Sequence, residues 1–383
     1  KIFKRIPYLD LVVGTQAIER LPQLIQRIEH KRCRIVDIEQ ADKPHFQETD
    51  VDIEAADQVS RFVTIMRGCD NFCSYCVVPY VRGREISRHP DDILKEIQQY
   101  VEAGLKEVTL LGQNVNSYGK KEKLCSFSEL LSRVSQIEPL LRIRFTTSHP
   151  KDFDGDLISA FQTNEKVCKH IHLPVQSGSN RVLKRMNRKY TKELYLDKVA
   201  KLRDTCPDIA ITSDIIVGFP AETEADFKAT LDLIQTIEFD GLFAFKYSDR
   251  PNAPAAEFDG KVSDQQKKDR LGILLDLQET ITRKKNQALV GDCLPILTEG
   301  FSKRQSSGNL NQPDQTVQWT GRTSTNKIVN FYQDGNPESR HAVFPGQLIN
   351  VKIEKAYSHS LWGKPVQDKP AFDGLKGESS YAA

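Results

Sequence analysis

Between residues 61 and 247 the chain alternates short apolar runs with longer amphipathic stretches. The apolar runs predict six strands, at residues 62–66, 107–111, 142–147, 170–173, 209–217 and 242–247. Apolar residues at helical spacing predict helices between them, at 90–103, 127–137, 153–163, 180–186, 191–204 and 222–237. Strands that alternate with helices imply parallel pairing and right-handed crossovers. We therefore expect an α/β domain, a partial (β/α)6 barrel in preference to an open doubly wound sheet.

Different patterns flank this region. Residues 1–58 contain a strand-like run at 10–14, a helical pattern at 17–28 and a polar, linker-like stretch at about 40–58. They resemble the last β/α unit of a domain whose beginning lies outside the chain. After a long helical segment at 264–288, strands at 293–299, 315–322, 327–331 and 348–353, with a turn at 333–337, predict a small all-β module. We expect a five-stranded barrel of the oligonucleotide-binding type.

These patterns define the expected domains. Residues 1–58 form the end of an N-terminal domain with its linker, residues 59–289 the α/β barrel, and residues 290–366 the all-β module. A polar tail at 367–383 follows, which we expect to be disordered.

The composition is that of a soluble protein with several domains. The 383 residues are 39% hydrophobic and 28% charged, and no apolar run is long enough to span a membrane. No secretory leader opens the chain, and the net charge of +2 does not identify a partner. Five isolated cysteines are untypical of a secreted disulfide framework and indicate a cytoplasmic location: Cys33, Cys125, Cys168, Cys206 and Cys293.

The other three cysteines follow the first predicted strand and carry the candidate chemistry. Cys69, Cys73 and Cys76 lie on one short loop with the spacing C-x3-C-x2-C. Three thiolates can hold three irons of a cubane iron–sulfur cluster and leave the fourth iron open to a small molecule. A structural zinc site is the alternative, but it requires a fourth ligand, for which the nearest candidate is His89. We favour the cluster, at the strand ends where α/β folds bind ligands.

Other segments allow two interpretations each. The polar residues at 112–114 can hold an amino-acid head group or form an ordinary turn. The apolar run at 212–218 can lie beside an adenine or be a buried parallel strand. His172 is either a core histidine or a functional one. Six basic residues between 181 and 192 form a solvated helix face or contact phosphate. Four aromatic residues of the all-β module stack on bases or fill its core: Trp319, Phe331, Tyr332 and Tyr357.

The cysteine loop and its flanks resemble a known superfamily. C-x3-C-x2-C after the first strand of a β/α barrel is the hallmark of radical S-adenosylmethionine (SAM) enzymes. Five segments resemble the methylthiotransferase branch, and in it the tRNA-2-methylthio-N6-dimethylallyladenosine synthases: 73–85, 111–118, 145–150, 172–179 and 214–220. The resemblance runs from about residue 8 to 363. Residues 321–323 and 329–331 make the all-β module similar to a TRAM domain, an RNA-binding barrel.

The resemblance implies a reaction and a set of residues. The three cysteines would carry a 4Fe-4S cluster whose fourth iron binds SAM, and a 5′-deoxyadenosyl radical would remove hydrogen from C2 of an isopentenylated adenosine beside the tRNA anticodon. Tyr75 would lie near the adenine of SAM. The other residues assigned to SAM are Gly112, Gln113, Asn114, Ser148, His172, Gln176, Asp214, Val217, Gly218 and Tyr247. The residues assigned to RNA are Arg82, Arg84, Arg185, Arg188, Arg322, Lys327 and Phe331.

The resemblance also implies partners. These are a tRNA anticodon stem-loop and a reductant such as flavodoxin or ferredoxin, and we expect a monomer without a membrane partner. The family carries a second, auxiliary 4Fe-4S cluster on three further cysteines of its N-terminal domain. Cys33 does not match those ligands, so we expect the chain to be a fragment and the second cluster to lie in the missing part. Ala221 is a smaller departure, since the family usually has glycine there.

Two other functions remain open at this stage. The first is a sister methylthiotransferase that acts on threonylcarbamoyladenosine in tRNA or on a ribosomal protein. The second is a non-enzymatic, metal-bearing RNA-binding protein. The segments at 111–118 and 145–150 favour the dimethylallyladenosine enzyme.

Overall fold

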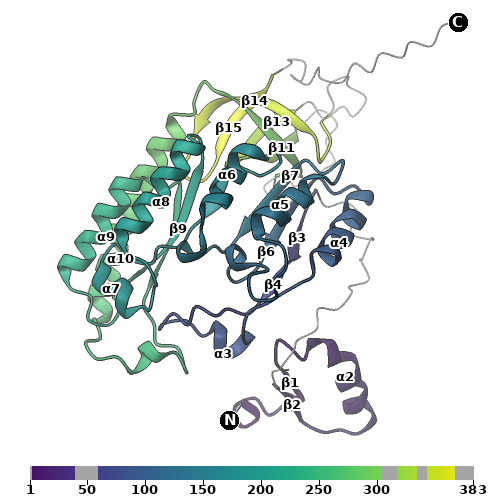
Figure 1. Ribbon diagram of the computed structural model, residues 1–383, viewed down its shortest axis with the longest axis vertical. Coiled ribbons are helices and arrows are strands. Elements are labelled where there is room, and N and C mark those ends of the chain that lie inside the picture. Colours follow the sequence, from purple (N-terminus) through teal and green to yellow (C-terminus); the bar gives the residue numbers. More distant parts are fainter. Residues whose placement is uncertain (1, 39–58, 303–316, 334–342, 367–383) are drawn as a thin grey trace, which may run out of the picture.

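Six parallel strands form the centre of the molecule (Figure 1). The computed structural model describes residues 2–38, 59–302, 317–333 and 343–366. Two three-stranded sheets, β3-β6-β7 and β8-β9-β10, are joined by a bridge between Ile143 and Val167. The strands are β3 (Ser60–Thr64), β6 (Glu107–Leu111), β7 (Arg142–Thr146), β8 (His170–His172), β9 (Ala210–Val217) and β10 (Gly241–Lys246). Within the described residues β3 and β10 do not pair, so the predicted partial barrel is confirmed.

Helices cover the outer face of these strands, as predicted. They are α4 (Pro90–Glu102), α5 (Phe127–Ser135), α6 (Gly155–Thr163), α7 (Asn180–Arg185), α8 (Lys192–Thr205), α9 (Glu224–Ile237) and α10 (Asp264–Gln287). Several begin at a side chain that accepts a hydrogen bond from a backbone N–H of the first turn: Ser126, Asp154, Ser179, Thr191, Thr223 and Ser263. Short 3-10 helices lie at η3 (Val115–Ser117), η4 (Pro150–Asp152) and η5 (Pro254–Glu257).

The two faces of the strands differ in polarity. Val108, Leu110, Ile143 and Phe145 are fully or nearly fully buried in the core under the helices. Because side chains alternate along a strand, the residues between them point to the inside of the partial barrel. On β6 to β9 that inner face is polar, with Glu107, Thr109, Arg142, Arg144, His170, His172, Thr212 and Asp214.

A closed five-stranded barrel follows α10, which confirms the predicted architecture. The strand order is β11-β12-β13-β15-β14. The strands are β11 (Cys293–Phe301), β12 (Val317–Thr323), β13 (Ile328–Gln333), β14 (Leu348–Ala356) and β15 (Leu361–Pro365). The sequence did not predict β15, whose five residues include glycine and proline. Gly363 is nevertheless required there, because a Cβ would lie 2.3 Å from the carbonyl oxygen of Lys352.

The N-terminal part contains a parallel pair of strands, β1 (Leu11–Val13) and β2 (Ile35–Asp37). Between them lie η1 (Ile18–Arg20) and α2 (Leu21–His30), and α1 (Ile2–Arg5) precedes them. This is the β/α unit that the sequence predicted, with a second strand that it did not. The expected linker, the turn at 333–337 and the tail lie wholly or largely outside the described residues. No described helix is long and apolar enough to cross a membrane.

The small barrel closes the amino ends of the large barrel's strands. Arg142 donates hydrogen bonds to the carbonyl oxygens of Arg322 (2.5 Å) and Pro295 (3.2 Å). Arg144 donates to the carbonyl oxygens of Thr323 (2.8 Å) and Ser324 (3.2 Å), and it forms a buried ion pair of 2.9 Å with Glu107. Two arginines of β7 therefore hold both domains together, at the end of the strands opposite to the cysteine loop.

We predict that Arg144→Ala lowers the free energy of unfolding by about 3 kcal/mol, because it leaves Glu107 as a buried charge without a partner. Arg133→Ala is the control. Arg133 pairs with Glu129 at 2.6 Å on the surface of α5, so its loss changes stability by less than about 0.5 kcal/mol. Urea unfolding followed by circular dichroism measures both. Equal, small effects of the two substitutions would refute the structural role of Arg144.

Candidate functional site

The cysteine loop is held at its base by a two-stranded hairpin. β4 (Met66–Arg67) pairs with β5 (Ile86–Ser87), and α3 (Val78–Arg82) lies between them in the sequence. Gly68 has a φ of 77°, and a Cβ there would lie 2.1 Å from the carbonyl oxygen of Arg84, so only glycine fits. The Cys69 N–H donates to the carbonyl oxygen of Gly83 at 3.3 Å. The loop therefore has a fixed position at the carboxyl ends of the strands.

The three thiols are largely withdrawn from water, and two of them lie beside N–H donors. Cys73 is buried, and burial raises the pKa of Cys69 to about 11 and also raises the pKa of Cys76. Two N–H donors point at sulfur: Asn71 Nδ2 lies 3.6 Å from Cys69 Sγ, and Arg188 Nη1 lies 3.4 Å from Cys73 Sγ. Such donors stabilise thiolate ligands.

The described residues contain no group of three His, Cys, Asp or Glu side chains that could hold a single metal ion. A cubane cluster makes a different demand, because each thiolate binds a different iron and the sulfurs surround the cluster.

Arg188 is the main electrostatic feature of the site. Its side chain is buried, and its nitrogens donate to the carbonyl oxygen of Pro174 (2.6 Å), Tyr190 Oη (2.8 Å) and Tyr75 Oη (3.5 Å), besides Cys73. Burial disfavours its charge, but nearby Tyr190, Tyr75 and Cys73 raise the pKa overall. No carboxylate of the described residues forms an ion pair with it. A buried cation in this position favours an anionic group beside Cys73.

Polar side chains without partners gather where β6 and β7 end. Buried side-chain atoms there that lack a hydrogen-bond partner are Gln113 Oε1, Asn114 Oδ1, Asn116 Nδ2 and Oδ1, Ser148 Oγ and His149 Nε2. Because native proteins rarely leave buried polar atoms unpaired, this set indicates a ligand. Gly112 lies at the same strand end, where a Cβ would lie 2.4 Å from Met66 Cγ.

Sequence reasoning missed Asn116 and His149 in this group. The Lys151 N–H donates to Nδ1 of His149 at 3.2 Å, which assigns the ring proton to Nε2, and burial lowers the pKa of the ring well below its usual range. Lys151 Nζ also donates to Asn71 Oδ1 at 2.8 Å, so the loop after β7 contacts the cysteine loop. Asn116 and His149 lie inside the segments 111–118 and 145–150 that the sequence analysis singled out. Only the structure shows that their side chains are buried at the ends of β6 and β7.

The predicted residues of β8 and β9 lie together on the inner face. His172 Nε2 is 3.4 Å from Asp214 Oδ1, and His172 Nδ1 is 3.1 Å from Thr212 Oγ1. Gln176 has a φ of 76°, and its N–H donates to the carbonyl oxygen of Asp214 at 2.9 Å. These three predicted residues therefore form one polar group at the carboxyl ends of β8 and β9.

An aromatic cluster lies beside the end of β9. Tyr247 and Phe219 pack with ring centres 5.2 Å apart, and Tyr75 packs against the same cluster. Gly218 has a φ of 71° and begins the turn. The assignment of Val217 to the cofactor is corrected here: its side chain has no exposed surface and lies in the core under the helices, because it is on the outer face of β9.

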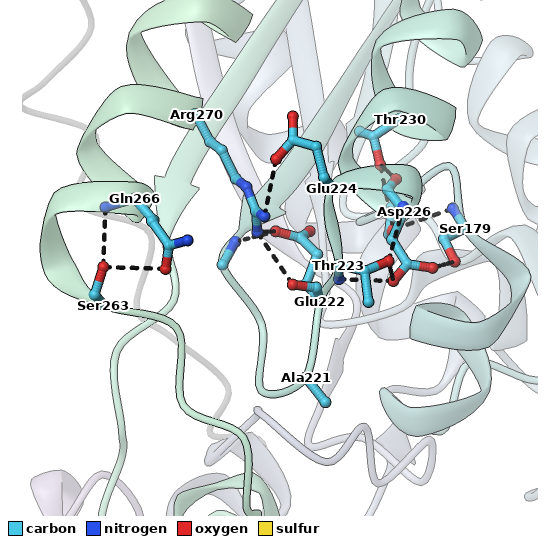
Figure 2. Close-up of polar contacts among 12 residues, drawn as sticks. Ser179, Ala221, Glu222, Thr223, Glu224, Asp226, Thr230, Ser263, Gln266 and Arg270 are labelled. Carbon is cyan, nitrogen blue, oxygen red and sulfur yellow. Dashed lines mark hydrogen bonds and ion pairs between the residues drawn. The ribbon is translucent and has the colours of Figure 1, made fainter.

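A network of polar contacts fixes the turn between β9 and α9 (Figure 2). Glu222 accepts hydrogen bonds from the Gly218 N–H (2.6 Å) and from Arg270 of α10 (2.8 Å). Asp226 accepts from Thr223 in a capping box and from Ser179 at the start of α7 (2.5 Å). Ala221 has a φ of 65° inside this turn. The network ties α7, α9 and α10 to the end of β9.

The predicted RNA contacts are dispersed. Arg82 and Arg84 are exposed beside the cysteine loop, and Arg84 pairs with Asp70 at 3.1 Å. Arg185 lies over the Phe258 ring at 5.1 Å. Arg322 pairs with Glu299 (2.8 Å) and Lys327 with Asp240 (3.4 Å). Two assignments are wrong: Arg188 is buried at the cysteine loop, and Phe331 has no exposed surface because it fills the core of the small barrel.

The chain is similar in sequence to a known superfamily and to several known proteins. The model of the radical SAM superfamily matches residues 63–234. The tRNA-2-methylthio-N6-dimethylallyladenosine synthase of Desulfosudis oleivorans is 52% identical over 377 residues, which are 98% of this chain and 80% of that protein. The synthase of Syntrophus aciditrophicus is 49% identical over 368 residues, 95% of this chain and 75% of that protein.

The solved structure of coproporphyrinogen III oxidase from Escherichia coli, a radical SAM enzyme, is also similar. It has a TM-score of 0.44 and 14% identity, over 73% of this chain and 70% of that one.

We predict that Ala221→Gly raises the free energy of unfolding by about 0.5–1 kcal/mol. A left-handed backbone costs a non-glycine residue about 1–2 kcal/mol, which exceeds the entropy that glycine adds to the unfolded chain. Ala200→Gly, on the exposed face of α8, is the control and lowers stability by about 1 kcal/mol. Thermal unfolding of both variants compares them, and a loss of stability in Ala221→Gly contradicts the assignment of strain to this turn.

Proposed function

The chain belongs to the tRNA-2-methylthio-N6-dimethylallyladenosine synthases, a family of radical SAM enzymes, and we propose that it adds a methylthio group to C2 of N6-dimethylallyladenosine beside the tRNA anticodon. It is a tRNA methylthiotransferase that uses a 4Fe-4S cluster and SAM. The similarity to synthases of this one substrate disfavours the sister methylthiotransferase and the non-enzymatic readings.

Cys69, Cys73 and Cys76 hold the cluster in this proposal. The observation that carries it is the buried guanidinium of Arg188, which lies 3.4 Å from Cys73 Sγ and has no carboxylate partner among the described residues. A cluster with three thiolate ligands is anionic and balances that charge. When bound, the cluster supplies the electron that splits SAM.

SAM binds between the cysteine loop and the strand ends. The unpartnered atoms of Asn114, Asn116 and Ser148 offer hydrogen bonds to its amino-acid end and ribose, together with the backbone at Gly112 and Gln113. His149 offers its Nε2 proton as a donor. Tyr75 and Tyr247 provide aromatic surface for the adenine. His172, Gln176, Asp214 and Gly218 complete the inner wall.

The remaining assignments concern partners and domains. Arg82, Arg84 and Arg185 are proposed to contact the RNA near the cysteine loop. Arg322 and Lys327 are expected to attract RNA less strongly, because Glu299 and Asp240 partly neutralise their charges. The small barrel at 290–366 is a TRAM domain, and the α/β barrel occupies 59–289.

We propose that the protein is a cytoplasmic monomer, reduced by a flavodoxin or ferredoxin. We also propose a second, auxiliary 4Fe-4S cluster, which the resemblance to this family implies.

We predict that Cys73→Ala abolishes SAM cleavage, because two thiolates do not hold the cluster. The measurement is 5′-deoxyadenosine formed by anaerobically reconstituted, dithionite-reduced protein, together with its iron content. Cys293→Ala is the control, since Cys293 is exposed on β11, away from the loop. We expect at least a hundredfold loss in Cys73→Ala and none in the control. Cleavage that persists in Cys73→Ala would place the cluster elsewhere.

A further inference from the structure

Three phenylalanine side chains are unusually exposed on the two strands that border the opening of the partial barrel. Phe243 and Phe245 of β10 are 59% and 54% exposed, and Phe62 of β3 is 70% exposed. Large apolar side chains are normally buried in a strand at the centre of a domain. A concentration of them at an opening indicates a surface that another molecule covers.

The alternation of side chains places these rings on the inner face of the barrel. Arg61 and Val63, the neighbours of Phe62, lie toward α4, where Arg61 is 4.6 Å from the Tyr100 ring centre and Val63 is in the core. Leu242 and Ala244, which flank Phe243, pack against the same core on the outer side. Phe62, Phe243 and Phe245 must therefore point inward.

Phe243 connects this apolar surface to the polar group proposed for SAM. It pairs in register with Asp214, and its ring centre is 5.8 Å from that of His172. It also lines a cavity of about 490 Å³ in which Leu242 and Leu275 stand beside a mainly polar wall that includes Asp240, Gln278 and Glu279. A group held against Phe243 is thus next to His172 and Asp214, two of the residues proposed for SAM.

The charges around the cavity disfavour an acidic occupant. Asp214 is a partly exposed carboxylate next to Phe243. The basic side chains of Arg322 and Lys327 also line the cavity, but they pair with Glu299 and Asp240. An N6 substituent that ends in a carboxylate would meet phenyl rings and a like charge, whereas a branched five-carbon alkenyl group packs against the phenyl rings and brings no charge near Asp214.

We propose that Phe243, Phe245 and Phe62 form the receptacle for the dimethylallyl substituent of the target adenosine, and that they select it over unmodified and acid-bearing adenosines. This inference rests on the proposed function and adds the residues that set substrate choice. It makes the three phenylalanines specificity-determining residues that contact the substrate.

The continuation of the cavity supports an RNA occupant. It shares Arg322, Ile328 and residues 358–360 with a groove of about 940 Å³ on the small barrel. The groove is lined by Tyr332 and Trp362, whose ring centres are 4.7 Å apart, and by Lys355 and Tyr357. Aromatic rings with a nearby cation are suited to stack unpaired bases. Nucleotides next to the target can therefore follow the groove while the modified base enters the barrel.

The test compares three anticodon stem-loop RNAs that differ only in the target base: adenosine, N6-dimethylallyladenosine and N6-threonylcarbamoyladenosine. Their dissociation constants with the reconstituted protein are measured by fluorescence anisotropy, without SAM, so the readout does not depend on catalysis. We expect the wild type to bind the dimethylallyl RNA about tenfold more tightly than either of the others. Phe243→Ala and Phe245→Ala abolish this preference and leave the affinity for the unmodified RNA unchanged.

Two further variants make the result specific. Phe245→Leu keeps an apolar side chain and retains most of the preference. Phe301→Ala removes a ring that is equally exposed (51%) but lies on β11 of the small barrel, and it leaves the preference intact. Thermal unfolding verifies that every variant is folded.

The outcomes separate the two proposals. A wild-type preference that survives in both alanine variants overturns the receptacle and leaves the proposed function standing. Equal losses for all three RNAs also overturn it, since they assign the phenylalanines to general RNA binding. No preference in the wild type contradicts the substrate of the proposed function itself.

Discussion

A buried guanidinium without a carboxylate partner is the constraint on which the site depends. Arg188 contacts a thiol, two phenols and a carbonyl oxygen, and no carboxylate of the described residues forms an ion pair with it. Burying a charge without a counter-ion is unfavourable in free energy, and Arg188 is such a charge beside Cys73. An anionic cluster on the three cysteines removes the cost, so cluster binding and the local fold stabilise each other. The same arginine joins the end of α7 to the cysteine loop.

The two ends of the six parallel strands have different structural roles. At the carboxyl ends, the loops after β6, β7 and β9 bring unpartnered polar atoms and an aromatic cluster around the cysteines. At the amino ends, Arg142 and Arg144 hold the small barrel against the sheet through backbone carbonyl groups. The opening between β3 and β10 remains as the approach to the inner face. The exposed phenylalanines of β3 and β10 border that opening, and the groove of the small barrel shares lining residues with the cavity beside Phe243.

Much of this arrangement could be predicted from the sequence. The alternation of apolar runs and amphipathic helices is a local signal, and it located all six barrel strands within a few residues. The C-x3-C-x2-C spacing identified the loop that the structure places at the carboxyl ends of the strands. What the sequence could not reveal depends on burial. Arg188 belongs to a basic run that reads as a surface, yet it is the one that turns inward. Phe331 and Val217 were misassigned because the sequence does not tell which face of a strand is covered. β15 was missed because barrel closure, not propensity, makes it a strand.

The central claim is that the cluster on Cys69, Cys73 and Cys76 directs SAM-derived radical chemistry at a base held on the inner face of the barrel. The most direct measurement uses a stem-loop RNA with deuterium at C2 of its N6-dimethylallyladenosine. The reduced enzyme is mixed with this RNA and SAM, and the 5′-deoxyadenosine is analysed by mass spectrometry. The account predicts that deuterium appears in the 5′-deoxyadenosine. A product that forms at the same rate without deuterium would show that the radical does not reach this carbon and would contradict the account.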